Sequence, residues 1–588
     1  MRECNTLSLT SLKAILQLLL ERQGRSTYHS HHRRTPPSLK QQVSTCWMDF
    51  TAAYRHASWR CIAFSPGSTF LASVTGDDAC SIVVRASSTL QVIRTWTLEA
   101  SISILEWSPD GAFLLAAHPG QKEDGVVFVV SLDPAKEAND GSDEGSGWVA
   151  RISSGSDGLS HATWAPPYGP KTLILFSQNH LRASLYNLVD QHISAIESPK
   201  HDKIVWSPKQ PNFFVSILKG AERDSLYIFS CQKMTHKDLQ QFTNKPKSEE
   251  MWKVEQAFHL AVNDAHDVTW APDGSCLAVW EGPLEYKLQI YSPLGVLRAT
   301  FLIEPDSKTS TPVTRTGILP DPRPQSSKRR NECNAELPHI VAGGGLGIRQ
   351  VKWHPSSLFL SVGGGDEKVR VLESIEWEEV ASLDLSSTSI RPSKDPTSMP
   401  IYGPLIAWRE PLSWLEETRA RGIVGLEQAS LPLTLSSSKI DATKPNKAGI
   451  SWMGWSAEGN LLAAFNERLP HAVWIFAFSE PGEARVSGRS PRLLAVMQLN
   501  GVAKKIQWRP GHIGKLGVVC ENRAICTWEL IPTASAGEGG RQYRQRAEAI
   551  PIPNDDLKAS QLQWSADGQK ILLASESLFC CAFEAVEG

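Results

Sequence analysis

The strongest constraint on the fold is a short hairpin pattern that recurs nine times along the chain. In each copy an apolar residue, one intervening residue and an aromatic residue precede a turn, as in Val268 and Trp270 before "APDG". A spacing of two places both side chains on one face of a strand, and Pro, Asp and Gly favour a tight reversal. Each copy therefore predicts a β-hairpin. The nine pairs are Ile62/Phe64, Leu105/Trp107, Ala162/Trp164, Ile204/Trp206, Val268/Trp270, Val351/Trp353, Met453/Trp455, Ile506/Trp508 and Leu562/Trp564.

Further strands follow most of these turns. A short apolar segment comes next, and a third segment such as "SIVVRAS", "KLQIYS" or "AVWIFAF" often follows it. Three strands with room for a fourth, repeating about every 40 residues apart from insertions, are typical of a β-propeller blade. The sequence thus predicts an all-β, WD40-type propeller, most simply one ring of about nine blades. Two smaller propellers, or seven or eight blades with a stray hairpin, remain alternatives.

The two ends of the repeat array complement each other. The last unit ends in "SLFCCAFEAVEG", which supplies a third strand but leaves no residues for a fourth. Residues 48–58 precede the first unit and can provide that missing strand, which would close the ring and leave no open sheet edge. Residues 1–47 are then expected outside the ring, as a disordered extension or as sequence upstream of a true start at Met48.

Two long insertions interrupt the array. Residues 303–345 are rich in Pro, Ser, Thr and charge, with too little apolar surface to form a core. Residues 386–447 form the second insertion, and "PLSWLEETRARGIVGLEQ" (411–428) within it predicts a short helix. The predicted organisation is a propeller over residues 48–588 with disordered insertions at 303–345 and 386–447.

The sequence shows no pattern for catalysis or cofactor binding. The eleven cysteines form no CxxC pair and have no histidine at zinc spacing, which favours reduced thiols in a cytosolic or nuclear protein. The glycine runs "GGGLG" (343–347) and "GGGDE" (363–367) lack the context of a phosphate-binding turn. A net charge of −2 argues against a general nucleic-acid binder, and no apolar run is long enough to span a membrane. We therefore expect no catalytic residue, cofactor, metal, nucleic acid or membrane.

Tryptophan is abundant, with twenty residues in the chain. Eight of them occupy the aromatic position of the repeat. That position predicts packing in the core rather than base stacking or a ligand cage.

Three stretches carry a more specific resemblance. They are "DVTWAPDGSCLAVWEGPLEYKLQIYSPLGVL" (267–297), "GIRQVKWHPSSLFLSVGGGDEKVRVLESIEWEEV" (347–380) and "NERLPHAVWIF" (466–476). These stretches closely resemble the centrosomal and spindle-pole WD-repeat protein family, and the chain is identified as a fungal member of it. The resemblance runs from about Met48 to the C-terminus and departs in the two insertions.

The resemblance implies a function and a set of partners. Members of the family are non-enzymatic adaptors in the cytoplasm and cytoskeleton, at centrosomes or spindle pole bodies, where they help to anchor microtubule minus ends and organise the mitotic spindle. The implied partner is a coiled-coil anchoring protein, joined in fungi by a minus-end-directed kinesin and γ-tubulin-associated components. No catalytic residue is implied.

Two loops are candidate partner-binding segments, since each lies between the second and third strands expected for its blade. Loops of this type share one face of a propeller and can form a common surface, although local turn geometry explains them equally well. The candidate residues are Leu284, Glu285, Tyr286, Lys287, Asn466, Glu467, Arg468 and His471.

Two other classes of function compete with the adaptor. A propeller scaffold in translation initiation, or in another RNA-associated complex, would need a basic face or tail, whereas this chain ends in "CCAFEAVEG". A propeller enzyme would need carboxylates, histidines or metal ligands converging near the channel, and the sequence shows no such set.

Overall fold

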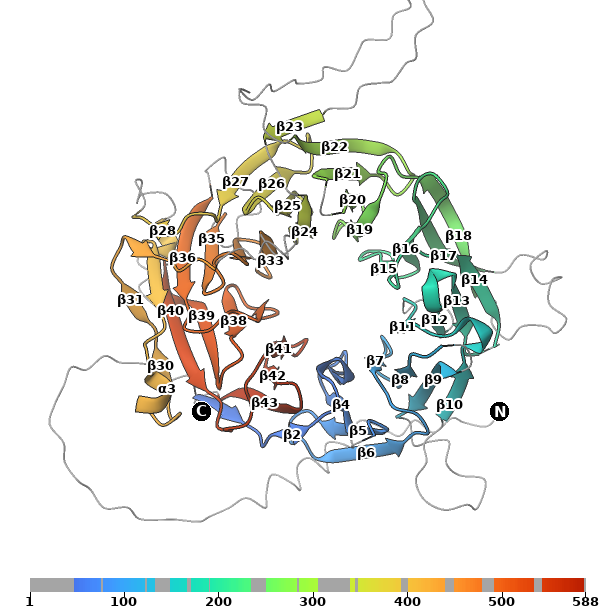
Figure 1. Cartoon of the computed structure of the whole chain (residues 1–588), viewed down its shortest axis with the longest axis horizontal. Coiled ribbons are helices and arrows are strands. Elements are labelled where there is room, and N and C mark those ends of the chain that lie inside the picture. The colour runs from blue at the N-terminus through green and yellow to red at the C-terminus, as the bar shows by residue number, and fades with distance from the viewer. Residues whose placement is uncertain are drawn as a thin grey trace, which may run out of the picture. The chain divides into compact units, whose positions relative to one another are not determined.

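In the computed structural model, antiparallel β-sheets are arranged around a ring (Figure 1). The structure describes residues 47–585 except 76–77, 122–123, 133–148, 167–170, 190, 234–249, 283–284, 305–338, 344–346, 393–399, 439–448, 479–490 and 534–541. These residues belong to one unit, Trp47–Gly588. The predicted extension at 1–47 therefore lies outside the described residues, apart from Trp47.

Within the described part of the chain, nine sheets have four or more strands, and each sheet is one blade. The first strand of each blade lies nearest the centre of the ring (Figure 1). The prediction of one large ring of about nine blades is confirmed, and the described strands do not divide into two smaller propellers.

The first three blades have four strands each. Blade 1 comprises β3 (Ile62–Phe64), β4 (Phe70–Thr75), β5 (Ser81–Ala86) and β6 (Val92–Thr97). Blade 2 comprises β7 (Ile104–Trp107), β8 (Phe113–His118), β9 (Val126–Ser131) and β10 (Val149–Ser153). Blade 3 comprises β11 (His161–Trp164), β12 (Thr172–Phe176), β13 (Arg182–Asn187) and β14 (Ile193–Glu197). The 3-10 turns η1 (Trp59–Cys61), η4 (Gly155–Asp157) and η5 (Gln178–His180) lie in the connections.

The middle blades continue the pattern. Blade 4 comprises β15 (Val205–Trp206), β16 (Phe213–Leu218), β17 (Ser225–Lys233) and β18 (Glu250–His259). Blade 5 comprises β19 (Ala265–Trp270), β20 (Leu277–Glu281), β21 (Lys287–Tyr291), β22 (Leu297–Glu304) and β23 (His339–Gly343). Blade 6 comprises β24 (Ile348–Trp353), β25 (Phe359–Gly364), β26 (Lys368–Glu373) and β27 (Glu379–Asp384).

The last three blades receive strands from elsewhere in the chain. Blade 7 comprises β33 (Ile450–Trp455), β34 (Leu461–Asn466), β35 (Ala472–Ala477) and β36 (Arg492–Gln498), extended by β29 (Ile406–Arg409) and β31 (Glu427–Ala429). Blade 8 comprises β37 (Lys505–Trp508), β38 (Lys515–Val519), β39 (Ala524–Thr533) and β40 (Gln542–Pro551), extended by β30 (Val424–Gly425). Blade 9 comprises β41 (Gln561–Trp564), β42 (Lys570–Ala574), β43 (Leu578–Ala585), β1 (Trp47–Phe50) and β2 (Tyr54–Arg55).

The repeated hairpins form for the reasons that the sequence suggests. In blade 2, Leu105 and Trp107 are both buried. At the turn, Asp110 Oδ1 accepts hydrogen bonds from Ser108 Oγ (2.5 Å) and from the Ala112 N–H (3.1 Å). Gly111 then takes a φ of 71°, which disfavours residues with a Cβ. Seven of the nine aromatic residues of the repeat are buried, whereas Trp206 and Trp455 are half-buried.

The predicted closure of the ring is also confirmed. Strand β1 pairs antiparallel with β43, with Trp47 opposite Ala585 and Phe50 opposite Ala582. Just beyond β1, the Thr51 N–H donates to the Cys581 carbonyl (2.9 Å), and Thr51 Oγ1 accepts from the Cys581 N–H (3.0 Å). The N-terminal segment therefore supplies the fourth strand of blade 9.

The prediction of a disordered insertion at residues 386–447 is wrong for its described part. Strand β29 pairs in parallel with β36 of blade 7, and β30 pairs with β40 of blade 8. Between them lies the single helical turn α3 (Trp414–Glu417), which falls within the predicted helix, and β31 follows β30 and pairs with β29. Strands β28 (Ser389–Ile390) and β32 (Leu433–Thr434) pair with each other, and η6 (Pro400–Tyr402) precedes β29. The insertion therefore clamps the outer edges of two blades.

A buried core explains why this insertion folds. Tyr402, Trp408 and Trp414 are all buried in one cluster with residues of blades 7 and 8. The buried Gln545 side chain of β40 donates to the Pro404 carbonyl (3.1 Å) and accepts from Trp408 Nε1 (3.5 Å). Burial of these aromatic side chains and pairing of the buried polar groups therefore stabilise the folded insertion, which its overall composition did not indicate.

The other insertion, predicted as disordered at residues 303–345, also contributes a strand. Strand β22 runs to Glu304, and β23 (His339–Gly343) pairs with it in parallel. The prediction is therefore wrong for these flanking segments, which extend blade 5. Residues 305–338 and 344–346 lie outside the described residues.

Replacing Thr51 by proline tests the closure. Proline removes the N–H that bonds Cys581 and the hydroxyl that accepts from it, and leaves buried backbone groups unpaired. We expect a loss of about 1–3 kcal/mol in the free energy of unfolding, measured by urea denaturation. Thr51→Ser keeps both bonds and should unfold near the wild-type midpoint, and an equal loss in both variants would contradict this account of closure.

The insertion clamp is tested by Trp408→Ala. Removal of a buried tryptophan that joins the insertion to blades 7 and 8 should cost about 3–5 kcal/mol of unfolding free energy. The control is Leu412→Ala in the same insertion, where a side chain that is 78% exposed should change stability by no more than about 0.5 kcal/mol. Equal denaturation midpoints for wild type and Trp408→Ala would show that the insertion does not stabilise the ring.

Candidate functional site

The innermost strands are joined by a recurrent hydrogen bond from a tryptophan indole. In each case the acceptor is the backbone carbonyl just before the repeat aromatic of the preceding blade. This bond links neighbouring blades around the channel, so the repeated tryptophans position the wall as well as filling the core. The bonds run from Trp107 Nε1 to Ala63 O (2.9 Å), Trp164 Nε1 to Glu106 O (3.4 Å), Trp270 Nε1 to Val205 O (3.2 Å) and Trp508 Nε1 to Gly454 O (2.8 Å).

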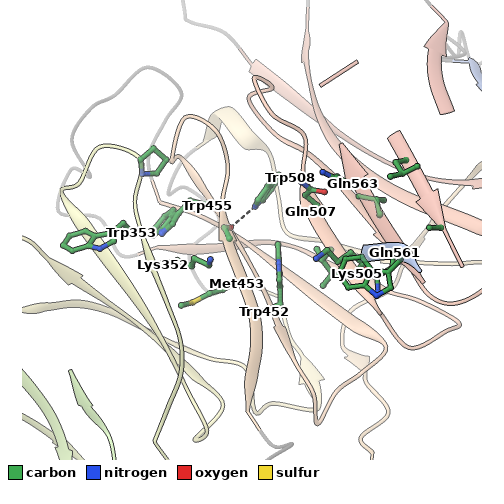
Figure 2. A pocket seen from close by; sticks show the side chains of 17 residues that line it. Lys352, Trp353, Trp452, Met453, Trp455, Lys505, Gln507, Trp508, Gln561 and Gln563 are labelled. Atoms are coloured by element: carbon green, nitrogen blue, oxygen red, sulfur yellow. Dashed lines mark hydrogen bonds between the residues drawn. The ribbon is translucent and has the colours of Figure 1, made fainter. Parts of the chain in front are cut away.

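A pocket of about 660 Å³ lies on the inner wall from blade 6 to blade 9. Figure 2 shows side chains from four innermost strands, β24, β33, β37 and β41, together with the bond from Trp508 to Gly454. The lining combines tryptophan, lysine and glutamine, and none of its residues is acidic. The polar and aromatic residues most relevant here are Lys352, Trp452, Lys505, Gln507, Gln561 and Gln563.

A second hollow continues the wall from blade 4 to blade 6. It has a volume of about 550 Å³ and shares Lys352 with the first pocket. Here the charges are paired, since Lys203 Nζ lies 2.7 Å from Asp267 Oδ2 and Arg349 lies 3.5 Å from Glu467 Oε2. Unbalanced positive charge is therefore concentrated on the side of the first pocket.

The electrostatics of Lys352 show the consequence of this imbalance. Burial lowers the pKa of its ammonium group, and the positive charges of Lys203 and Lys505 lower that pKa further, against the opposite effect of Asp267. Lys352 and Lys505 form no ion pair with any residue that the structure describes. The pocket can thus stabilise an anion, whereas it offers no acid–base pair for catalysis.

The two loops predicted to bind a partner instead meet one hairpin of blade 6. Tyr286, before β21, accepts from Arg370 Nη1 (3.1 Å), and Arg370 Nη2 lies 2.6 Å from Asp366 Oδ2. A Cβ on Gly364 would lie 2.7 Å from the Tyr286 ring, so this glycine allows the close approach. The run "GGGDE" is therefore explained by packing between blades 5 and 6.

The other loop reaches the same hairpin from blade 7. Glu367 Oε2 accepts from Asn466 Nδ2 (2.7 Å) and from Arg468 Nε (2.6 Å). Asn466 Nδ2 also donates to the Leu385 carbonyl (3.0 Å). The loops of blades 5 and 7 are thus both bonded to the blade 6 hairpin, one through Arg370 and the other through Glu367.

The eight predicted contact residues differ in what they can offer a partner. Tyr286 and Asn466 are buried, so their side chains cannot contact a partner directly, which corrects that part of the prediction. Lys287 bonds the Ala261 carbonyl (2.9 Å), and Glu467 and Arg468 form the ion pairs given above. Glu285 is exposed, His471 is half-buried and Leu284 lies outside the described residues. Partner binding by these loops stays a prediction.

The sequence reasoning missed the pocket residues, although a signal for them exists. Lys352, Gln507 and Gln563 each stand directly before a repeat aromatic, and Lys505 stands directly before Ile506. Side chains alternate along a strand, so these positions lie on the opposite face from the paired core residues. Reading the intervening position in each repeat would have identified this part of the wall.

Other kinds of site do not emerge from the described residues. Within them no group of three or more His, Cys, Asp and Glu side chains could hold a metal ion. None of the helices in the described ranges has the length and apolar character needed to cross a bilayer. The eight described cysteines are free thiols, and burial raises the pKa of Cys61 to about 12.

The ring of four-stranded blades, the aromatic repeat and the closure by an N-terminal strand define a WD-repeat β-propeller, a class that generally acts as a non-catalytic scaffold. The chain is similar to mouse WD repeat-containing protein WRAP73, with 24% identity over 551 residues that cover 91% of this chain and 96% of that protein. No family model matches the sequence. A fungal origin stays a prediction.

Two solved structures are also similar. Sqt1 from Chaetomium thermophilum matches with 13% identity and a TM-score of 0.40, over 81% of this chain and 94% of that one. The C-terminal WD40 domain of Sif2 matches with 10% identity and a TM-score of 0.40, over 92% of this chain and 99% of that one.

Glu106 gives a pH test of the inter-blade contacts. Its carboxyl group accepts from Thr163 Oγ1 (3.1 Å) across blades 2 and 3, and burial raises its pKa from 4.5 to about 7. Between these values the folded state binds more protons than the unfolded chain, so stability falls as pH rises through this window.

Glu106→Gln should therefore raise the melting temperature at about pH 8 and give no gain at about pH 5, measured by differential scanning fluorimetry. The exposed Glu99→Gln serves as the control, and its melting temperature should follow wild type at both pH values. A gain for Glu106→Gln that does not depend on pH would show that Glu106 is not protonated in the folded state.

Proposed function

We propose that this WD-repeat protein is a non-enzymatic adaptor at the centrosome or spindle pole body. There it helps to anchor microtubule minus ends and organise the mitotic spindle through a coiled-coil partner. The observation that carries the proposal is the likeness to WRAP73 over 91% of this chain and 96% of that protein. A likeness along nearly both lengths is what a shared role for the whole propeller requires.

The local geometry supports the same proposal. The three stretches that resemble the centrosomal and spindle-pole family lie in blades 5, 6 and 7. Their loops are tied together through Arg370 and Glu367. A rigid block of three blades presents side chains in fixed positions, which lowers the entropic cost of binding a partner.

Localisation tests the cellular part of the proposal. A fluorescent fusion of the full chain, imaged in dividing cells, should give discrete spots at the spindle poles. Affinity purification of the same fusion with mass spectrometry should recover a coiled-coil microtubule-anchoring protein, with a minus-end-directed kinesin or γ-tubulin-associated components. Diffuse signal together with recovery of ribosomal or initiation components would favour the RNA-associated alternative instead.

Glu285→Lys tests whether the loop of blade 5 contacts the partner. Glu285 is exposed, so charge reversal should leave the protein folded and reduce recovery of the coiled-coil protein in a quantitative pull-down. Glu376→Lys is the matched control, because Glu376 is equally classed as exposed but lies in the turn at the opposite end of β26. Equal recovery with both variants would restrict the role of the loop to holding blades together.

A further inference from the structure

The wall pocket from blade 6 to blade 9 has more hydrogen-bond donors than acceptors. Lys352 and Lys505 have no ion-pair partner among the described residues, whereas the adjacent Lys504 pairs with Glu521 (2.8 Å). The indole of Trp353 belongs to the core, where it packs against Trp377, so the unpaired donors of the pocket are the two ammonium groups. Two ammonium groups without a counter-charge suit a ligand that carries anionic acceptor oxygens.

The glutamines add donors that the fold does not use up. Gln507 Oε1 already accepts from the backbone N–H of Trp564 (3.2 Å), which leaves the side-chain NH2 of Gln507 to donate. Gln561 and Gln563 stand on the neighbouring strand β41 and line the same pocket. Primary amides at this spacing can bond the peptide groups of an extended chain, as they bond backbone groups elsewhere in the wall.

The size and aromatic content of the pocket further restrict the class of ligand that it can bind. A volume of about 660 Å³ falls in the range of established ligand pockets, roughly 300–1,000 Å³. Trp59 is 45% exposed, and Trp452 lies between Lys352 and Lys505 in the view of Figure 2. Their faces provide apolar surface for the aliphatic stems of glutamate side chains.

We propose that this pocket binds an acidic segment of a protein partner, with side-chain carboxylates paired to Lys352 and Lys505. The peptide backbone bonds the glutamine amides, and the tryptophans pack against the side-chain stems. This inference rests on the proposed function in one respect, namely that the ligand is part of a protein partner. It does not depend on where in the cell the protein acts.

A nucleic acid would also supply anionic oxygens, but the pocket fits it less well. The lining holds two lysines and no arginine, and the chain carries a net charge of −2. Recognition of a phosphate backbone draws on an extended basic surface, which these two groups do not form. Each side-chain carboxylate of a peptide carries one negative charge, which a single lysine can pair.

The test uses the purified full chain and a fluorescein-labelled peptide of alternating glycine and glutamate, with binding followed by fluorescence anisotropy. We expect saturable binding that weakens with added salt, and no binding of the matched glycine–glutamine peptide. The Lys352→Gln/Lys505→Gln double variant should weaken binding by about tenfold or more, since it removes two charge-assisted bonds. Lys504→Gln is the matched control and should bind like wild type.

Three further measurements make the outcome decisive. The melting temperature of each variant shows whether it is folded, and the single variants Lys352→Gln and Lys505→Gln provide the test if the double variant is not. Lys505→Glu should weaken the glutamate peptide more than Lys505→Gln does. Failure of the wild type to bind, equal affinity for variants and wild type, or tighter binding of a single-stranded oligonucleotide would overturn the proposal. None of these readouts depends on spindle-pole localisation, so this inference can fail while the proposed function holds.

Discussion

Four junctions of the ring share one hydrogen bond, which a tryptophan on the innermost strand of one blade donates to the backbone of the blade before it. Trp107, Trp164, Trp270 and Trp508 all make this bond. Because the acceptor is a backbone carbonyl, most side chains of the preceding blade can vary without loss of the contact. This explains how the repeats can diverge almost everywhere except at the aromatic residue and its apolar partner, and still form one ring.

The pattern changes between blades 6 and 9, which is where the first pocket lies. The indoles of Trp353 and Trp564 are buried without acceptors, and Trp455 donates instead to Ser361 Oγ (3.2 Å). Glutamine side chains take over the inter-blade contact there, with Gln350 Oε1 bonding the Met453 N–H (2.6 Å) and Gln507 Oε1 bonding the Trp564 N–H. Glutamine contacts therefore replace the indole bond between blades 6 and 7 and between blades 8 and 9, whereas Trp508 keeps the indole bond between blades 7 and 8.

The sequence predicted the ring and its closure because both rest on short-range patterns, namely the paired residues around each turn and the missing strand of the last unit. It did not predict the clamp, because β29 and β30 pair with edges whose availability depends on the completed blades. Trp408 and Trp414 were the visible signal, since large aromatics rarely occur in disordered segments. The candidate loops were located correctly between strands, but burial of Tyr286 and Asn466 depends on the next blade, which spacing alone does not show.

The ring closure, the insertion clamp and the loop contacts all help to fix the shape of the pocket. Blade 9 is fixed to the chain's N-terminal segment, blades 7 and 8 share the clamp, and blade 6 is tied to blade 7 through Glu367. All four blades that line the pocket are therefore held by contacts outside it. Contacts of this kind fix the backbone positions of Lys352 and Lys505 before a ligand arrives, which lowers the cost of ordering the wall on binding.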